Sequence, residues 1–163
     1  MLVTLLVTAG LVAACFFVHL ATLQRLAYRV NRADRPMRHP LMVVLLTLFV
    51  AHLFEVLLYA LALSALDWAE YGSLTGAIID GPGWFADHFY FSIASYTTLG
   101  IGDIVPVGEI RIVAGIEALN GLVLIAWSAS FTYLVMERLW GTSGRGATPE
   151  PQASARDTTP TIR

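Results

Sequence analysis

The chain has 163 residues, of which 56% are hydrophobic and 13% are charged, and its formal net charge is −2. Soluble domains carry about 25% charged residues, so this composition indicates a membrane protein. The single cysteine, Cys15, excludes an intrachain disulfide framework.

The first apolar segment, residues 1–24, contains no Asp, Glu, Lys or Arg and is long enough to cross a hydrocarbon core of about 30 Å. A cleavable secretory signal normally begins with basic residues, whereas the first arginine here, Arg25, follows the apolar run. A loose similarity to a lipoprotein cleavage site ends at Cys15, but hydrophobic residues continue beyond it. We therefore expect an uncleaved N-terminal transmembrane helix, with His19 as an interfacial side chain near its inner end.

Residues 25–40 form a short segment with five arginines and one acid, Asp34. A short loop with such an excess of arginine stays cytoplasmic, so the N-terminus is expected outside and the C-terminus in the cytoplasm. The arginine spacing also resembles that of a voltage-sensing helix. Pro36 would break such a helix, and a solvated loop is the better interpretation.

Two further apolar segments, residues 41–66 and 110–139, are also long enough to span a membrane. The connection between them, residues 67–109, carries six acids and no arginine, which agrees with an external location. The C-terminal residues 141–163 have a composition that cannot bury a core, so we expect a disordered cytoplasmic tail.

Four polar residues inside these two spans are candidates for a functional role. His52 and Glu55 are three residues apart, on one face of a helix; structural pairing is the simpler interpretation and a proton-sensitive gate is the alternative. Glu117 and Asn120 are expected either to face a cavity and raise the local cation concentration, or to hydrogen-bond between helices.

Residues 83–96 are apolar enough to enter the membrane but too short to cross it. A helix of about 13 residues covers roughly 20 Å, so this segment is expected to return to the side from which it entered. Its C-terminal dipole would then point at the polar stretch 97–103, which suits a cation. Gly100 and Gly102 permit backbone carbonyls to point the same way, and rings of such carbonyls replace the hydration shell of a cation in pores. The alternative is a buried connector with an ordinary turn.

With these residues in view, residues 41–140 resemble the pore module of the potassium channel family, which consists of an outer helix, a pore helix, a filter and an inner helix. The filter of that family reads Thr-Val-Gly-Tyr-Gly-Asp, and the matching residues here are Thr98, Leu99, Gly100, Ile101, Gly102 and Asp103. The resemblance implies that dehydrated K⁺ is coordinated by backbone carbonyls of this segment and by the Thr98 hydroxyl. It also implies that Thr97 and Asp103 support the filter and that Gly121 is a gating hinge in the inner helix.

Two positions depart from the pattern of the family. Ile101 stands where the family usually has Tyr or Phe, an aromatic that braces the filter against the pore helix, so strict discrimination of K⁺ from Na⁺ is less certain. Ala94 stands where some relatives have a carboxylate that pairs with the filter acid. Asp103 is therefore expected to bond instead to Trp84, Tyr90 or water.

The sequence thus predicts an all-α membrane protein with three transmembrane helices, a re-entrant pore helix and a selectivity filter. We expect a homotetramer, because one chain supplies one filter strand and a ring of carbonyls needs several. The first helix is expected to pack outside the pore and face lipid. The expected function is a passive, K⁺-selective channel of a bacterial inner membrane, without enzymatic activity, cofactor or nucleic-acid partner. The alternatives are a weakly selective monovalent cation channel and a non-conducting membrane adaptor with a pore-like fold.

Overall fold

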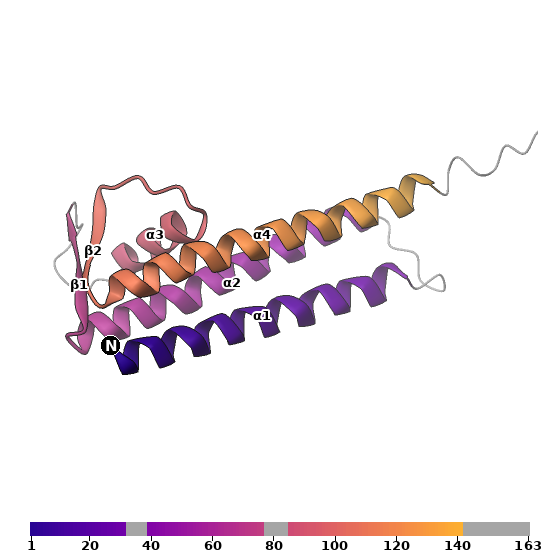
Figure 1. Ribbon diagram of the computed structural model, residues 1–163. Coiled ribbons are helices and arrows are strands. Elements are labelled where there is room, and N and C mark those ends of the chain that lie inside the picture. Colours follow the sequence, from indigo (N-terminus) through magenta and orange to yellow (C-terminus); the bar gives the residue numbers. More distant parts are fainter. Residues whose placement is uncertain (32–38, 77–84, 142–163) are drawn as a thin grey trace, which may run out of the picture.

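The computed structural model describes residues 1–31, 39–76 and 85–141 (Figure 1). Most of the arginine-rich segment, Trp84 and the tail from residue 142 onward lie outside the described residues. The expectations for these segments, including a disordered tail and a solvated arginine loop, therefore stay predictions.

Three long helices dominate the described chain: α1 (Leu2–Val30), α2 (Pro40–Trp68) and α4 (Ile110–Gly141). All three are long and apolar enough to cross a membrane, as the sequence predicts. Helix α2 begins with Pro40 at its first position, where the missing N–H has no helical partner to lose. Helix α1 continues about two turns beyond residue 24, because a helix can leave the hydrocarbon region and continue in water.

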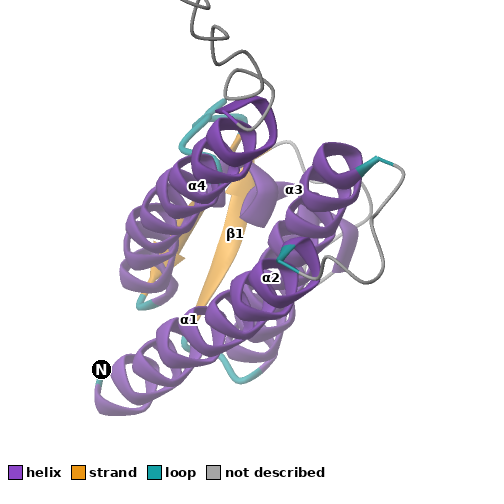
Figure 2. Ribbon diagram, turned by 90° about the vertical axis from the view of Figure 1, so that its right-hand side faces the viewer, coloured by secondary structure: helices purple, strands orange, loops and turns teal. Residues whose placement is uncertain are grey.

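The three long helices run side by side, with α2 antiparallel to α1 and α4 (Figures 1 and 2). Helix α1 packs against both α2 and α4. The core shared by the helices along the N-terminal half of α4 includes the fully buried side chains of Tyr59, Leu63 and Leu124. A second cluster, at the opposite end of the bundle, contains Leu26 and Val44.

The short helix α3 (Phe85–Tyr96) packs between α2 and α4. It occupies the position of the predicted re-entrant helix at residues 83–96. The chain leaves α3 at Tyr96 and returns towards the end of the bundle where the N-terminus lies (Figure 1). This arrangement leaves residues 97–103 as an irregular segment beside the helices.

A two-stranded antiparallel sheet joins the segments on either side of α3. Strand β1 (Gly72–Gly76) pairs with β2 (Ile104–Gly108), with Gly72 opposite Gly108 and Gly76 opposite Ile104. The all-helical expectation did not include these strands, because they are short and far apart in the sequence. At Gly76, φ is +124° and an added Cβ would lie 2.1 Å from the carbonyl oxygen of Asp103, so only glycine permits the contact. The sheet therefore holds the chain directly after residue 103.

Candidate functional site

The backbone between α3 and β2 alternates in handedness. Thr98, Gly100 and Gly102 have φ values of +57°, +56° and +85°, whereas φ is negative at Leu99 and Ile101. Successive residues of opposite handedness gather their N–H groups on one side of the chain, so their carbonyl oxygens face the other side. Thr98 adopts a conformation that costs energy for a residue with a Cβ. The segment is thus built to present a row of carbonyls.

The N–H groups at the start of this segment are occupied by the end of α3. The amide of Thr98 donates to the carbonyl of Ser95 at 2.9 Å, and those of Leu99 and Gly100 donate to the carbonyl of Ala94 at 2.9 and 3.2 Å. Within the described residues, no hydrogen bond reaches the carbonyl oxygens of residues 98–101. These four oxygens are therefore free to bind a ligand.

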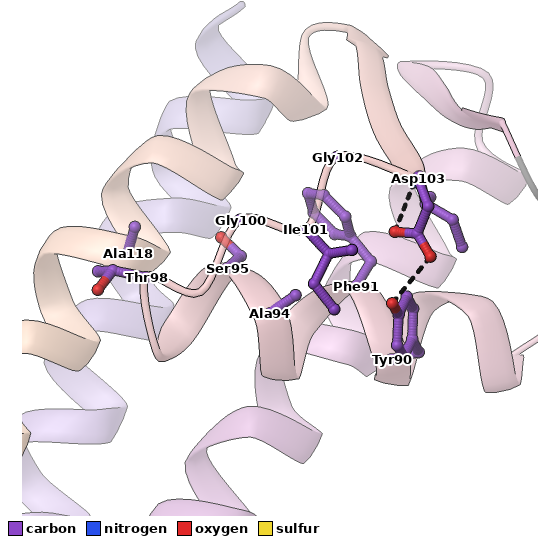
Figure 3. A pocket seen from close by; sticks show the side chains of 11 residues that line it. Tyr90, Phe91, Ala94, Ser95, Thr98, Gly100, Ile101, Gly102, Asp103 and Ala118 are labelled. Atoms are coloured by element: carbon purple, nitrogen blue, oxygen red, sulfur yellow. Dashed lines mark hydrogen bonds between the residues drawn. The ribbon is translucent and has the colours of Figure 1, made fainter.

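Asp103 ends the segment and is fixed from two sides. Its Oδ2 accepts a hydrogen bond from the Tyr90 hydroxyl at 2.8 Å, and its Oδ1 accepts one from the amide of Ile104 at 2.9 Å (Figure 3). The bond to the Asp103 carboxylate raises the pKa of Tyr90 above its ordinary value. Of the protein partners expected for Asp103, Tyr90 is confirmed, and Trp84 lies outside the described residues.

A cavity of about 240 Å³ lies between this segment and α3. The side chain of Ile101 points towards α3 and lines the cavity together with Phe91 and Ala94 (Figure 3). Ile101 keeps 55% of its surface exposed in the single chain. At the position where the resemblance implies a bracing aromatic, this chain therefore has a smaller aliphatic side chain beside an open space.

Gly121 lies where α4 passes the end of α3. A Cβ at this position would be 2.1 Å from the carbonyl oxygen of Tyr96, so the close approach of the two helices requires glycine. Helix α4 is continuous through this point. The hinge role implied by the resemblance is untested, but the structure gives Gly121 an independent packing role.

Glu117 and Asn120 lie on the face of α4 that is covered by α2 and α3. Both are buried. The Glu117 carboxylate accepts a hydrogen bond from Ser92 of α3, and Asn120 Nδ2 donates to the Tyr59 hydroxyl at 3.1 Å. The chain therefore adopts the interhelical alternative rather than a cavity-facing position. One oxygen of each residue, Glu117 Oε2 and Asn120 Oδ1, has no partner among the described residues.

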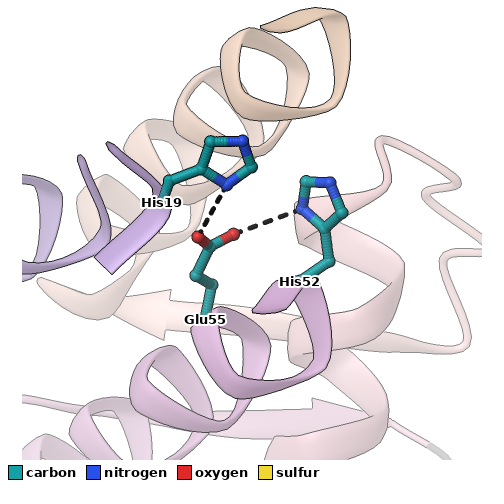
Figure 4. A group of neighbouring side chains, drawn as sticks. All are labelled: His19, His52 and Glu55. Atoms are coloured by element: carbon teal, nitrogen blue, oxygen red, sulfur yellow. Dashed lines mark hydrogen bonds and ion pairs between the residues drawn. The ribbon is translucent and has the colours of Figure 1, made fainter. Parts of the chain in front are cut away.

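His52 and Glu55 are paired, as the structural interpretation predicts, but they belong to a larger cluster. The expectation that His19 is interfacial was wrong: it is fully buried, and its Nδ1 lies 3.0 Å from Glu55 Oε1 (Figure 4). The reason is that α1 places His19 directly against α2 instead of at the membrane surface. Donor atoms of His19, His52 and Glu55 all lie within 4.8 Å of one another, which is close enough to hold a metal ion.

Two further members of this cluster were missed. Tyr96, the last residue of α3, donates to Glu55 Oε2 at 2.5 Å, and Ser128 of α4 lies 2.9 Å from His52 Nε2 and 3.1 Å from His19 Nε2. No spacing in the sequence relates Tyr96 and Ser128 to the other three residues, since the cluster draws on four different helices.

Comparisons with known proteins agree with this geometry. A family model described as "Ion channel" matches residues 42–138. The inward rectifier potassium channel Kirbac3.1 of Paramagnetospirillum magnetotacticum is 32% identical to this chain over 98 residues, which are 58% of this chain and 32% of that protein. The chain thus matches only about a third of the length of that relative, and no solved structure is a significant match. The chain belongs to the ion channel family, with a pore module of the potassium channel type.

Proposed function

We propose that this protein is a passive, K⁺-selective channel whose pore is formed by four copies of the chain. The observation that carries the proposal is the alternation of positive and negative φ over residues 98–102, with the amides of residues 98–100 bonded to α3 and the carbonyl oxygens of residues 98–101 left free. Such oxygens replace the water around a dehydrated K⁺. The Thr98 hydroxyl adds one further oxygen ligand, and no cofactor takes part.

The exposure of the filter supports assembly from several chains. Leu99 is 64% exposed and Ile101 is 55% exposed in the single chain. Irregular backbone at membrane depth is tolerated only where protein buries it or where it lines a water-filled path. Four copies around one axis satisfy both conditions, because carbonyls then face the axis and neighbouring chains cover the flanks. Membrane lipids would cover the remaining apolar surface of the long helices.

The orientation follows from the positions of the charges. The arginine-rich segment connects the ends of α1 and α2 opposite the filter, and arginine-rich loops stay cytoplasmic. The filter, the small sheet and the N-terminus are then outside, and the C-terminus is in the cytoplasm. We propose a bacterial inner membrane as the location.

Flux through liposomes containing the purified protein tests this function. We expect a Ba²⁺-blockable flux of K⁺ and a reversal potential that follows the K⁺ gradient in mixed K⁺ and Na⁺ solutions. A reversal potential that ignores K⁺ would replace the proposal with a weakly selective cation channel. Absence of any flux would favour a non-conducting adaptor.

A glycine substitution links the flux to the filter backbone. Gly100→Ala puts a Cβ on a residue with φ of +56°, which strains the filter. We expect loss of K⁺ flux from protein that still assembles. Gly10→Ala makes the same chemical change on α1, with no atom within 4 Å of the new Cβ, and should conduct normally. Equal flux from the two variants would contradict the assignment of the filter.

A further inference from the structure

Five polar side chains form a closed ring below the filter. We call this set the polar ring: His19 of α1, His52 and Glu55 of α2, Tyr96 of α3 and Ser128 of α4 (Figure 4 shows the first three). The ring includes the residue that directly precedes Thr97. It is therefore the place where all four helices meet the start of the filter segment.

The ring has more contacts than hydrogens when its acid is ionised and both imidazoles are neutral. Five contacts close the ring: His19 with Glu55 (3.0 Å), Tyr96 with Glu55 (2.5 Å), His52 with Tyr96 (2.8 Å), and Ser128 with each histidine (2.9 and 3.1 Å). His52 Nδ1 also lies 3.2 Å from Glu55 Oε2, and this sixth contact shares the hydrogen of the nitrogen that contacts Tyr96. Only four hydrogens are then available, one on each imidazole and one on each hydroxyl. One contact would bring two lone pairs together, so one additional proton satisfies the whole ring.

The surroundings favour that proton on a histidine. A carboxylate at membrane depth is costly without a cationic partner, and an imidazolium beside Glu55 makes the ring neutral overall. The ring of Trp127 lies 5.6 Å from His19, within the range in which an aromatic face stabilises a cation. The imidazoles of His19 and His52 are 5.2 Å apart, which disfavours a second positive charge.

Other titratable groups near Glu55 do not supply this charge. Cys15 of α1 and Tyr59 of α2 interact electrostatically with Glu55, and Glu117 of α4 acts on the same two residues. All three are neutral or negative. Among the described residues, the nearest source of positive charge for Glu55 is therefore a histidine of the ring itself.

We propose that the polar ring is a proton-binding site, in which His19 carries the bound proton as an imidazolium that donates to Glu55 and Ser128. The proton ties α1 to the carboxylate that holds Tyr96 and hence the end of α3. Loss of the proton leaves one contact unsatisfied, so the anchor beneath Thr97 weakens as pH rises. This coupling to conduction rests on the proposed function, whereas proton binding itself does not.

The same donor atoms raise the question of a metal. A tetrahedral Zn²⁺ needs nitrogen ligands at about 2.0–2.1 Å and would have to displace the proton between His19 and Glu55. The observed separations of 2.5–3.2 Å between partners are those of hydrogen bonds. The geometry therefore favours a proton, and metal binding is an outcome that the experiment distinguishes.

Solid-state NMR of full-length protein with ¹⁵N-labelled histidine, in lipid bilayers, tests proton binding independently of flux. His19 is assigned from the signals that disappear in His19→Gln. We expect imidazolium shifts for His19 near neutral pH and loss of one proton at alkaline pH, with simultaneous changes at His52. Neutral imidazoles at both positions from about pH 5 to pH 8 would overturn the proposal. So would movement of both Nδ1 signals by one equivalent of Zn²⁺.

Flux measurements then test the coupling. Loss of a hydrogen bond to a charged group predicts a fall in K⁺ flux of about tenfold or more between acidic and alkaline pH. His19→Gln should abolish this dependence. The matched control is His88→Gln, which removes another buried histidine that pairs with an acid, Asp67, at 3.0 Å. An unchanged pH profile in His19→Gln, with normal imidazolium signals in the wild type, would reject the coupling alone.

Discussion

Replacement of Gly121 by alanine tests whether close packing beneath the filter is essential. The new methyl group would lie 2.1 Å from the carbonyl oxygen of Tyr96 and 2.9 Å from both its carbonyl carbon and the Cγ of its ring. Ordinary contacts of this kind begin at 3.4 Å, so α4 or the end of α3 has to retreat by about 1 Å. Two of the three opposing atoms belong to the backbone and cannot rotate away.

The expected cost follows from two opposing terms. Overpacking of a well-filled site costs about 1–3 kcal/mol, and a clash with backbone belongs at the upper end of that range. Alanine in place of glycine in a helix returns about 0.8–1 kcal/mol. We therefore expect Gly121→Ala to lose about 2 kcal/mol per subunit, measured as a lower midpoint in thermal denaturation of the solubilised protein.

Gly115→Ala provides the control on the same helix, because no atom of the chain lies within 4 Å of its new Cβ. This variant should be as stable as the wild type or slightly more stable. If Gly121 served only as a gating hinge, Gly121→Ala would change the open probability of the channel but would have the same denaturation midpoint as the wild type. Equal midpoints for the two variants would therefore refute the packing argument.

Three further substitutions test the filter and its supports. Ile101→Tyr introduces an aromatic ring at the cavity beside α3, and we expect a severalfold rise in the permeability ratio of K⁺ to Na⁺; an unchanged reversal potential would show that the cavity does not limit selectivity. Tyr90→Phe removes the hydrogen bond from the Tyr90 hydroxyl to the Asp103 carboxylate and should lower the K⁺ flux. The pKa of Tyr90 is raised above 10.0, so the bond is intact below this pH and is lost only as pH rises through the higher value. Wild-type flux should therefore show an additional fall under strongly alkaline conditions that Tyr90→Phe lacks. Ser92→Ala removes a hydrogen bond to the buried carboxylate of Glu117 and should lower the free energy of unfolding by about 1–3 kcal/mol. Adding Glu117→Leu should recover part of this loss, whereas no recovery would argue against the Ser92 contact.

The main elements could be predicted because local physics determines them. An unbroken apolar run of the right length must become a helix in a bilayer, since every backbone group needs a partner there. This reasoning applied to α1, α2 and α4, and the shorter apolar run at α3 could only be re-entrant. The irregular backbone at residues 98–102 likewise followed from Gly100 and Gly102, whose conformational freedom is a local property; its role as a filter stays a proposal.

The features that were missed depend on contacts between distant segments. Strands β1 and β2 pair only because α3 brings residues 72–76 beside residues 104–108, and neither strand has an alternating pattern of its own. His19 was judged by its distance along the first helix, whereas its environment is set by how α1 packs against α2. Glu117 faces α3 because of the rotation of α4, which its neighbours in sequence do not reveal.

The contacts of α1 change how the first helix is understood. Its outer face carries exposed apolar side chains, such as those of Leu6 and Phe17, which agrees with the expectation of a lipid-facing helix. Its inner face, however, contacts the pore module at two levels. The Thr4 hydroxyl donates to Glu109, just before α4, and His19 closes the polar ring beneath the filter. The family match begins only at residue 42, so similarity of the pore cannot explain these contacts. Because α1 contacts the residue before α4 directly and the end of α3 through Glu55, it is positioned to influence the filter and is more than a membrane anchor.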